Sequence, residues 1–96
     1  MELKLKAQAG SFESSDVLIM VEPQPQGVGR KIELESIVMQ QFGDDLLLQI
    51  HRDLDAYGIK DIRVIINDKG ALPPTLSARL ETALKRSAGL QTGTLI

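Results

Sequence analysis

Three serines and two carboxylates lie within eight residues near the start of this chain, and their side chains are the ones best suited to chemistry. Residues 9–16 read A-G-S-F-E-S-S-D and lead directly into the apolar run 17–21. A serine hydroxyl can act as a nucleophile, or it can be the atom to which another enzyme attaches a group. Ser and Asp are also common in ordinary turns, because their side chains bond nearby backbone groups. The residue types alone leave Ser11, Ser14 and Ser15 as equal candidates for a modified hydroxyl.

A serine nucleophile of the hydrolase type needs a histidine base and an acid that orients that base. The sequence has one histidine, His51, and its place in a helical pattern predicts a polar tip that faces water. Asp55 follows one turn later, but without a second histidine or any cysteine the pair is at most half of a metal site. The acidic residues Asp44, Asp45 and Asp53 are expected to be solvated helix surface. We therefore predict a chain that is not an enzyme by itself and has no catalytic or metal-binding residue.

Composition indicates one small domain, residues 1–96, with an aliphatic core. Charged residues make up 25% of the chain, the net charge is −2 and aromatic residues make up 3%, so we expect no nucleic-acid partner. Cysteine is absent, which excludes disulfides. No apolar run approaches the roughly 20 residues of a membrane helix, and the alternating start M-E-L-K-L-K-A is unlike a signal peptide. We expect a cytoplasmic location and no membrane contact.

Hydrophobic periodicity predicts four strands. Strict alternation marks residues 3–5 and 31–35, whereas the continuous apolar run 17–21 is typical of a central strand. Residues 23–30 form a proline- and glycine-rich loop compatible with a wide hairpin, so strand 31–35 is expected to run antiparallel to its predecessor. Residues 61–68 supply the last strand, which ends at a turn that contains Gly70.

Two helices follow from a change of period to nearly four. The first is predicted over residues 38–57, with Ser36 as N-cap, a possible break at Gly43 and a left-handed end at Gly58. Its apolar stripe consists of Val38, Phe42, Leu46, Ile50 and Leu54. The second opens at Pro73 and Pro74, ends at Gly89 and has a stripe of Leu76, Leu80, Ala83 and Leu84. Residues 91–96 are expected to be a loose tail.

This order of elements predicts an α+β fold, a two-layer sandwich. We expect a small mixed or antiparallel sheet of about four strands with both helices on one face. This arrangement buries the apolar stripe of each helix against the sheet and leaves residues 9–16 as a polar loop at the surface.

Four short motifs, each weak by itself, occur together in one order and at one set of spacings. They are A-G-S-F-E-S-S-D-V at 9–17, Q-F-G-D at 41–44, D-K-G-A-L at 68–72 and A-R-L-E at 78–81. In this combination the chain resembles the acyl carrier protein, or gamma subunit, of citrate lyase, over about residues 9–89. The resemblance extends to the similar carrier of citramalate lyase.

The resemblance implies a carrier subunit. In that family a serine of the motif E-S-G-D or E-S-S-D bears 2'-(5''-phosphoribosyl)-3'-dephospho-CoA through a phosphodiester, and the arm's thiol holds an acetyl or citryl thioester. Matched by position, that serine is Ser14, and residues 9–16 are the attachment loop. The implied partners are the alpha subunit (acyl transferase), the beta subunit (citryl lyase) and the transferase that installs the arm. A chain without the arm would instead be a protein-interaction module of such a complex.

Overall fold

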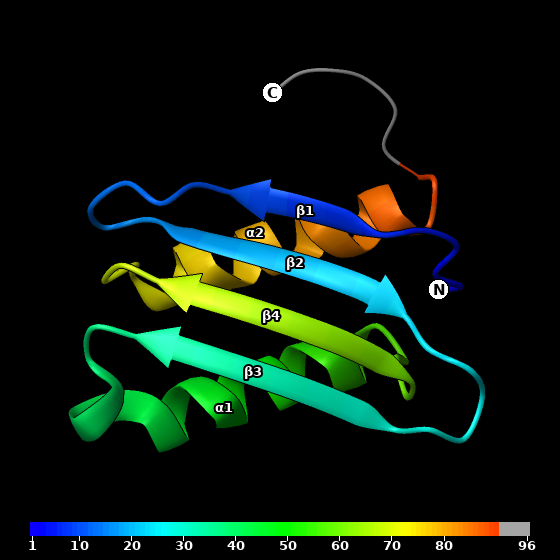
Figure 1. Cartoon of the computed structure of the whole chain (residues 1–96), viewed down its shortest axis with the longest axis horizontal. Coiled ribbons are helices and arrows are strands. Elements are labelled where there is room, and N and C mark those ends of the chain that lie inside the picture. Colours follow the sequence, from blue (N-terminus) through cyan, green and yellow to red (C-terminus); the bar gives the residue numbers. More distant parts are fainter. Residues whose placement is uncertain (91–96) are drawn as a thin grey trace.

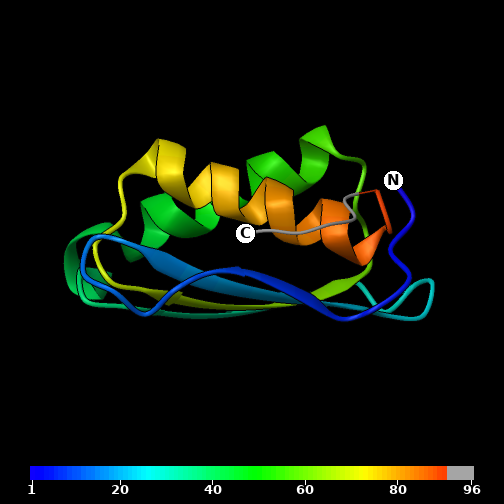
Figure 2. The ribbon, with the colours of Figure 1, turned by 90° about the horizontal axis from the view of Figure 1, so that it is seen from above.

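The computed structural model describes residues 1–90 and contains one four-stranded sheet with two helices (Figure 1). Both helices cover the same face of the sheet, and the other face is open (Figure 2). The predicted α+β two-layer fold is confirmed, and the sheet is mixed. The elements are β1 (Ala7–Gly10), β2 (Val17–Pro23), β3 (Arg30–Ser36), α1 (Met39–Ala56), β4 (Ile62–Asp68) and α2 (Pro73–Ser87). The predicted loose tail, residues 91–96, lies outside the described residues.

The strand order is β1-β2-β4-β3, so the last strand in sequence inserts between β2 and β3. It pairs antiparallel with β2 and parallel with β3, for example Val64 with Val21 on one side and with Ile32 on the other. β3 therefore runs antiparallel to β2, as expected. The predicted hairpin is wrong, because β4 lies between these two strands and they do not pair with each other. The reason is burial: β4 hides Ile62, Val64 and Ile66 on its helix-facing side, and a central position covers these residues best.

The N-terminal strand begins later than its alternation predicts. Residues 3–5 are not a strand; pairing with β2 starts at Ala7, where Ala7 faces Val21. The N–H groups of Lys4 and Leu5 instead donate to the carbonyl of Ser87, at 2.9 and 3.2 Å. This carbonyl ends α2 and has no partner within the helix, so the N-terminal segment caps the helix rather than extending the sheet.

α1 is continuous through Gly43, so the predicted break is wrong. Gly43 is buried, and a Cβ there would lie 3.2 Å from the Met39 sulfur, so the missing side chain leaves room for Met39. The N-cap is Val38 rather than Ser36. Phe42, predicted to lie on the apolar stripe, is 50% exposed. At the other end Gly58 has φ +69, which confirms the predicted left-handed termination.

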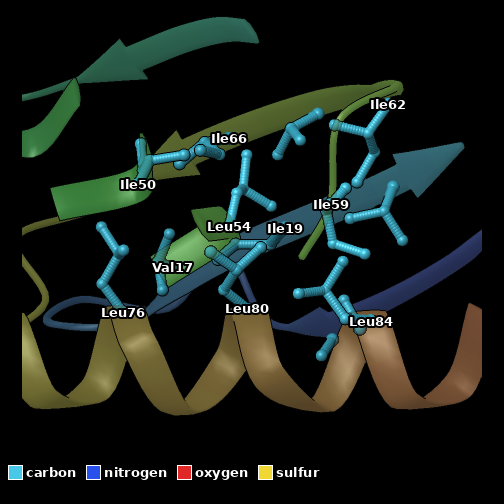
Figure 3. Packing of buried hydrophobic residues seen from close by; sticks show 14 of the residues in the cluster. Val17, Ile19, Ile50, Leu54, Ile59, Ile62, Ile66, Leu76, Leu80 and Leu84 are labelled. Carbon is cyan, nitrogen blue, oxygen red and sulfur yellow. The ribbon is translucent and has the colours of Figure 1, made fainter. Parts of the chain in front are cut away.

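The core lies between the sheet and the two helices and is aliphatic (Figure 3). α2 contributes every residue of its predicted stripe, and its two prolines occupy the first helical positions, where a missing N–H breaks no helical hydrogen bond. The largest fully buried apolar side chains are Ile19, Ile50, Leu54, Ile62, Ile66, Leu76, Leu80, Leu84, Val17, Val21 and Val64. None of the helices within residues 1–90 is long and apolar enough to cross a membrane.

Candidate functional site

The serine-rich loop connects β1 to β2 and spans residues 11–16, because Ala9 and Gly10 belong to β1. Gly10 has φ +96, and a Cβ at this position would lie 1.7 Å from the Val17 carbonyl oxygen. That oxygen accepts a hydrogen bond from the Ser11 N–H at 3.2 Å. Only glycine fits this close approach of the two strands, so the two ends of the loop are held at a fixed separation.

Asp16 organises the loop from its C-terminal end. Its carboxylate accepts hydrogen bonds from the Ser11 hydroxyl (2.7 Å) and the Val17 N–H (2.7 Å). The Arg79 guanidinium on α2 donates to it through Nε (3.1 Å) and Nη2 (3.4 Å). The Ser11 hydroxyl, followed by the Val17 N–H and Arg79, lowers the pKa of the Asp16 carboxyl below its usual range, and burial opposes this shift. The ionised Asp16 carboxylate thus joins the loop to both β2 and α2.

A second set of contacts joins the loop to the turn after β4. The Ser15 N–H donates to the Lys69 carbonyl (2.8 Å), and the Lys69 N–H donates to the Asp16 carbonyl (2.9 Å). The turn is ordered by Asp68, which is 1% exposed and accepts bonds from the Ala71 N–H and the Ser36 hydroxyl. Segments about fifty residues apart in the sequence therefore lie side by side, at the left-hand ends of the strands in Figure 1.

Three of the four sequence motifs meet at this place. The loop 11–16, the turn 68–72 and Arg79 of the segment 78–81 are connected by the hydrogen bonds above. The fourth motif, residues 41–44, lies in the first turns of α1, and none of the recorded hydrogen bonds among residues 1–90 joins it to the loop. Sequence reasoning missed Arg79, although its occurrence in one of the four motifs was a signal that it could have used.

The three serines differ in their surroundings. The Ser11 hydroxyl is engaged twice, because it donates to Asp16 and accepts from the Glu13 N–H at 3.2 Å. Ser15 is exposed, and its hydroxyl also has no hydrogen-bond partner within residues 1–90, but its backbone is left-handed, with φ +65. Ser14 is exposed in a turn of the loop, and its hydroxyl has no hydrogen-bond partner within residues 1–90. Of the three, Ser14 therefore combines an ordinary backbone with a hydroxyl that is open to a partner.

Within residues 1–90 the only carboxylate bonded to one of these serine hydroxyls is Asp16, which accepts from Ser11, and no histidine contacts any of the three. His51 is exposed on α1, and its Nδ1 lies 3.0 Å from Nη1 of Arg30. The same guanidinium donates to Asp55 at 2.7 Å. The two side chains considered as half of a metal site thus share an arginine. Across residues 1–90, no group of three or more potential ligands is arranged to hold a metal ion.

Comparison with known proteins gives consistent results. The model of the family described as malonate decarboxylase delta subunit (MdcD) matches residues 4–87. The citrate lyase acyl carrier protein of Klebsiella pneumoniae is 42% identical over 88 residues, which cover 92% of this chain and 90% of the relative. That of Halothermothrix orenii is 41% identical over 88 residues, with 92% of each chain covered. The chain belongs to the family of the citrate lyase acyl carrier proteins.

The fold of this family member is also found in a solved assembly. A chain in the crystal structure of a Pseudomonas malonate decarboxylase hetero-tetramer in complex with malonate superposes with a TM-score of 0.70. The match covers 86% of this chain and 84% of that chain at 20% identity. An identity this low shows a shared fold alone. The resemblance seen in the four sequence motifs is confirmed by the family match.

Proposed function

We propose that this chain is the acyl carrier subunit of a citrate lyase complex and that Ser14 is its attachment residue. The observation that carries the proposal is an exposed serine hydroxyl with no activating side chain beside it. It lies on a loop whose two ends are held in place, in a chain of the citrate lyase acyl carrier family. A carrier modified by a separate transferase needs an accessible hydroxyl and no catalytic machinery of its own. The absence of a second histidine and of cysteine in the sequence agrees with this role.

The attached group is proposed to be 2'-(5''-phosphoribosyl)-3'-dephospho-CoA, linked through a phosphodiester. When bound, it supplies the thiol that carries the acyl group while citrate is cleaved to oxaloacetate and acetate. The chain's own residues hold the attachment point in place: Asp16 connects the loop to α2, and Ser15 connects it to the turn after β4. The alpha and beta subunits and the installing transferase are the proposed partners, each of which must reach Ser14.

The test is the intact mass of the protein purified from its native host. We expect one adduct of the mass of the arm on the wild-type chain, no adduct on Ser14→Ala and a normal adduct on Ser11→Ala and Ser15→Ala. An adduct that persists on Ser14→Ala would refute the site. An unmodified native protein that co-purifies with no lyase subunits would refute the function.

A second candidate follows from the family description, which names malonate decarboxylase. The 41–42% identity to citrate lyase carriers, against 20% to the malonate decarboxylase chain, favours citrate lyase. The co-purified complex should therefore turn over citrate and not malonate. Citramalate in the same assay tests the related lyase.

A further inference from the structure

A polar groove of about 550 Å³ begins at the attachment loop and continues along the outer strand of the sheet. Its walls are β1, the loop 11–16 and α2. Glu13 lines the groove, and Ser14 is the next residue in the chain. A group attached to Ser14 would therefore start at one end of this groove.

Two arginines of α2 line the groove. Arg79 and Arg86 are seven residues apart, which is two helical turns or about 10 Å along the helix, so they face the same side. Thr82 lies between them and also lines the groove. Their spacing places one guanidinium beside the loop and the other two turns away from it.

The charges along the groove are unevenly compensated. Arg79 is paired with Asp16, so its charge is balanced at the loop. Arg86 donates through Nη1 to the Gln8 carbonyl at 2.8 Å, and no carboxylate within residues 1–90 forms an ion pair with it. Glu13 adds negative charge at the loop end. The far end of the groove is therefore its positive end, with a guanidinium that has donors left for an anion.

We infer that this groove is a docking track for the phosphate groups of the arm on Ser14, with Arg86 as the main phosphate-binding residue. The inference rests on the proposed function. Guanidinium groups recognise phosphate through paired N–H donors, and the positive charge beyond Glu13 draws the arm away from the loop and along β1.

The docking is expected to be weak and reversible. A short tether gives the arm an effective concentration on the order of millimolar at its own carrier. A groove with an intrinsic dissociation constant in that range holds the arm for about half of the time. The arm then remains available to the active sites of partner subunits, while its phosphates are shielded on the carrier between visits.

The experiment compares amide NMR spectra of the modified chain with those of Ser14→Ala, after intact mass has established the modification. We expect shifts at Gln8, Thr82 and Arg86 in addition to the loop, and we expect the shifts beyond the loop to be lost in modified Arg86→Gln. The matched control is Arg52→Gln, because Arg52 is exposed on α1 and forms no recorded ion pair within residues 1–90. Arg52→Gln should retain all of the shifts. Since phosphate binding is electrostatic, high salt should reduce the same shifts.

Free dephospho-CoA, added to Ser14→Ala, tests the groove without the tether. It should move the same three amides at millimolar concentration, with the effect lost in the double variant with Arg86→Gln. Shifts confined to residues 11–16 on a modified chain would overturn the groove and leave the carrier function intact. Shifts that persist in Arg86→Gln would also overturn it. A native chain with no adduct on Ser14 would overturn both proposals.

Discussion

Replacement of Asp16 by alanine should loosen the attachment loop and destabilise the whole domain. The change removes a carboxylate that accepts hydrogen bonds from the Ser11 hydroxyl, the Val17 N–H and the Arg79 guanidinium. All three donors would lose their acceptor at once. Two of them lie outside the loop, on β2 and α2, so the effect is not confined to the loop.

The size of the effect follows from the surroundings of each donor. Val17 is 0% exposed, so its N–H would lose its acceptor in a buried position, which costs about 1–3 kcal/mol. The Arg79 side chain is 43% exposed, so the loss of its ion pair adds at most about 1 kcal/mol. The Ser11 hydroxyl can bond water instead. The sum is about 1–4 kcal/mol, and its midpoint of about 2.5 kcal/mol lowers the Tm of a domain of this size by roughly 10–20 °C.

The pH dependence gives a second, independent signature. The pKa of Asp16 is lowered in the folded chain, so its contribution to stability is present above the ordinary aspartate pKa of about 3.9. That contribution is lost as pH falls through the lower, folded-state pKa. Asp16→Asn lacks this titration, so the difference in stability between wild type and Asp16→Asn should shrink as the solution is acidified below about pH 4.

The assay is urea or thermal unfolding of wild type, Asp16→Ala and Asp16→Asn over a pH series, with Asp44→Ala as matched control. Asp44 is exposed on α1 and accepts no recorded hydrogen bond within residues 1–90, so its replacement should change Tm little. If Asp16→Ala costs no more than Asp44→Ala at neutral pH, Asp16 does not hold the loop to the rest of the fold.

Three further predictions concern other parts of the chain. Gly10→Ala should lower the free energy of unfolding in urea by at least about 3 kcal/mol, because its Cβ would lie 1.7 Å from a backbone oxygen. The control Gly27→Ala, with φ +90 but open space around it, should lower it by only about 1–2 kcal/mol. Equal losses in the two variants would contradict the steric argument. Ser15→Gly should be neutral or stabilise by up to about 1 kcal/mol, because φ +65 suits glycine; a clear loss of stability in the same assay would show that the serine side chain itself is needed. The hydrogen bond that the Tyr57 hydroxyl donates to Glu81 raises the pKa of Tyr57 to about 12. Phenolate absorbance of this single tyrosine should therefore appear near pH 12, and nearer pH 10 in Glu81→Gln. The contribution of this hydrogen bond to the free energy of unfolding is present below about pH 10 and is lost as pH rises toward 12.

Hydrophobic periodicity predicted most of the helices and strands, because each of them buries one face of its own residues. The stripes of α2 and of the second half of α1, and the apolar runs of β2 and β4, lie where the sequence pattern places them. The pattern failed where few residues carried it. Leu3 and Leu5 alternate, but the N–H groups of Lys4 and Leu5 bond the Ser87 carbonyl, which has no acceptor role within α2, instead of pairing with a strand.

Strand order was beyond local reasoning. Nothing in residues 23–30 shows that β4 would come between the two strands that this loop connects. Alternation tells which face of a strand is buried, but it does not tell which strand is the neighbour. That choice depends on the burial of the whole sheet, including a strand that is formed about thirty residues later.

The same division holds for the attachment loop. The sequence by itself determined that residues 11–16 are mostly polar, rich in serine and without histidine, because these properties belong to residue types. Only the tertiary structure decided how the serines differ. Asp16 bonds Arg79 and Ser15 bonds Lys69, and both partners lie more than fifty residues away along the chain. Hydrogen bonds over that separation exist only after folding, so the accessibility of Ser14 is a property of the fold.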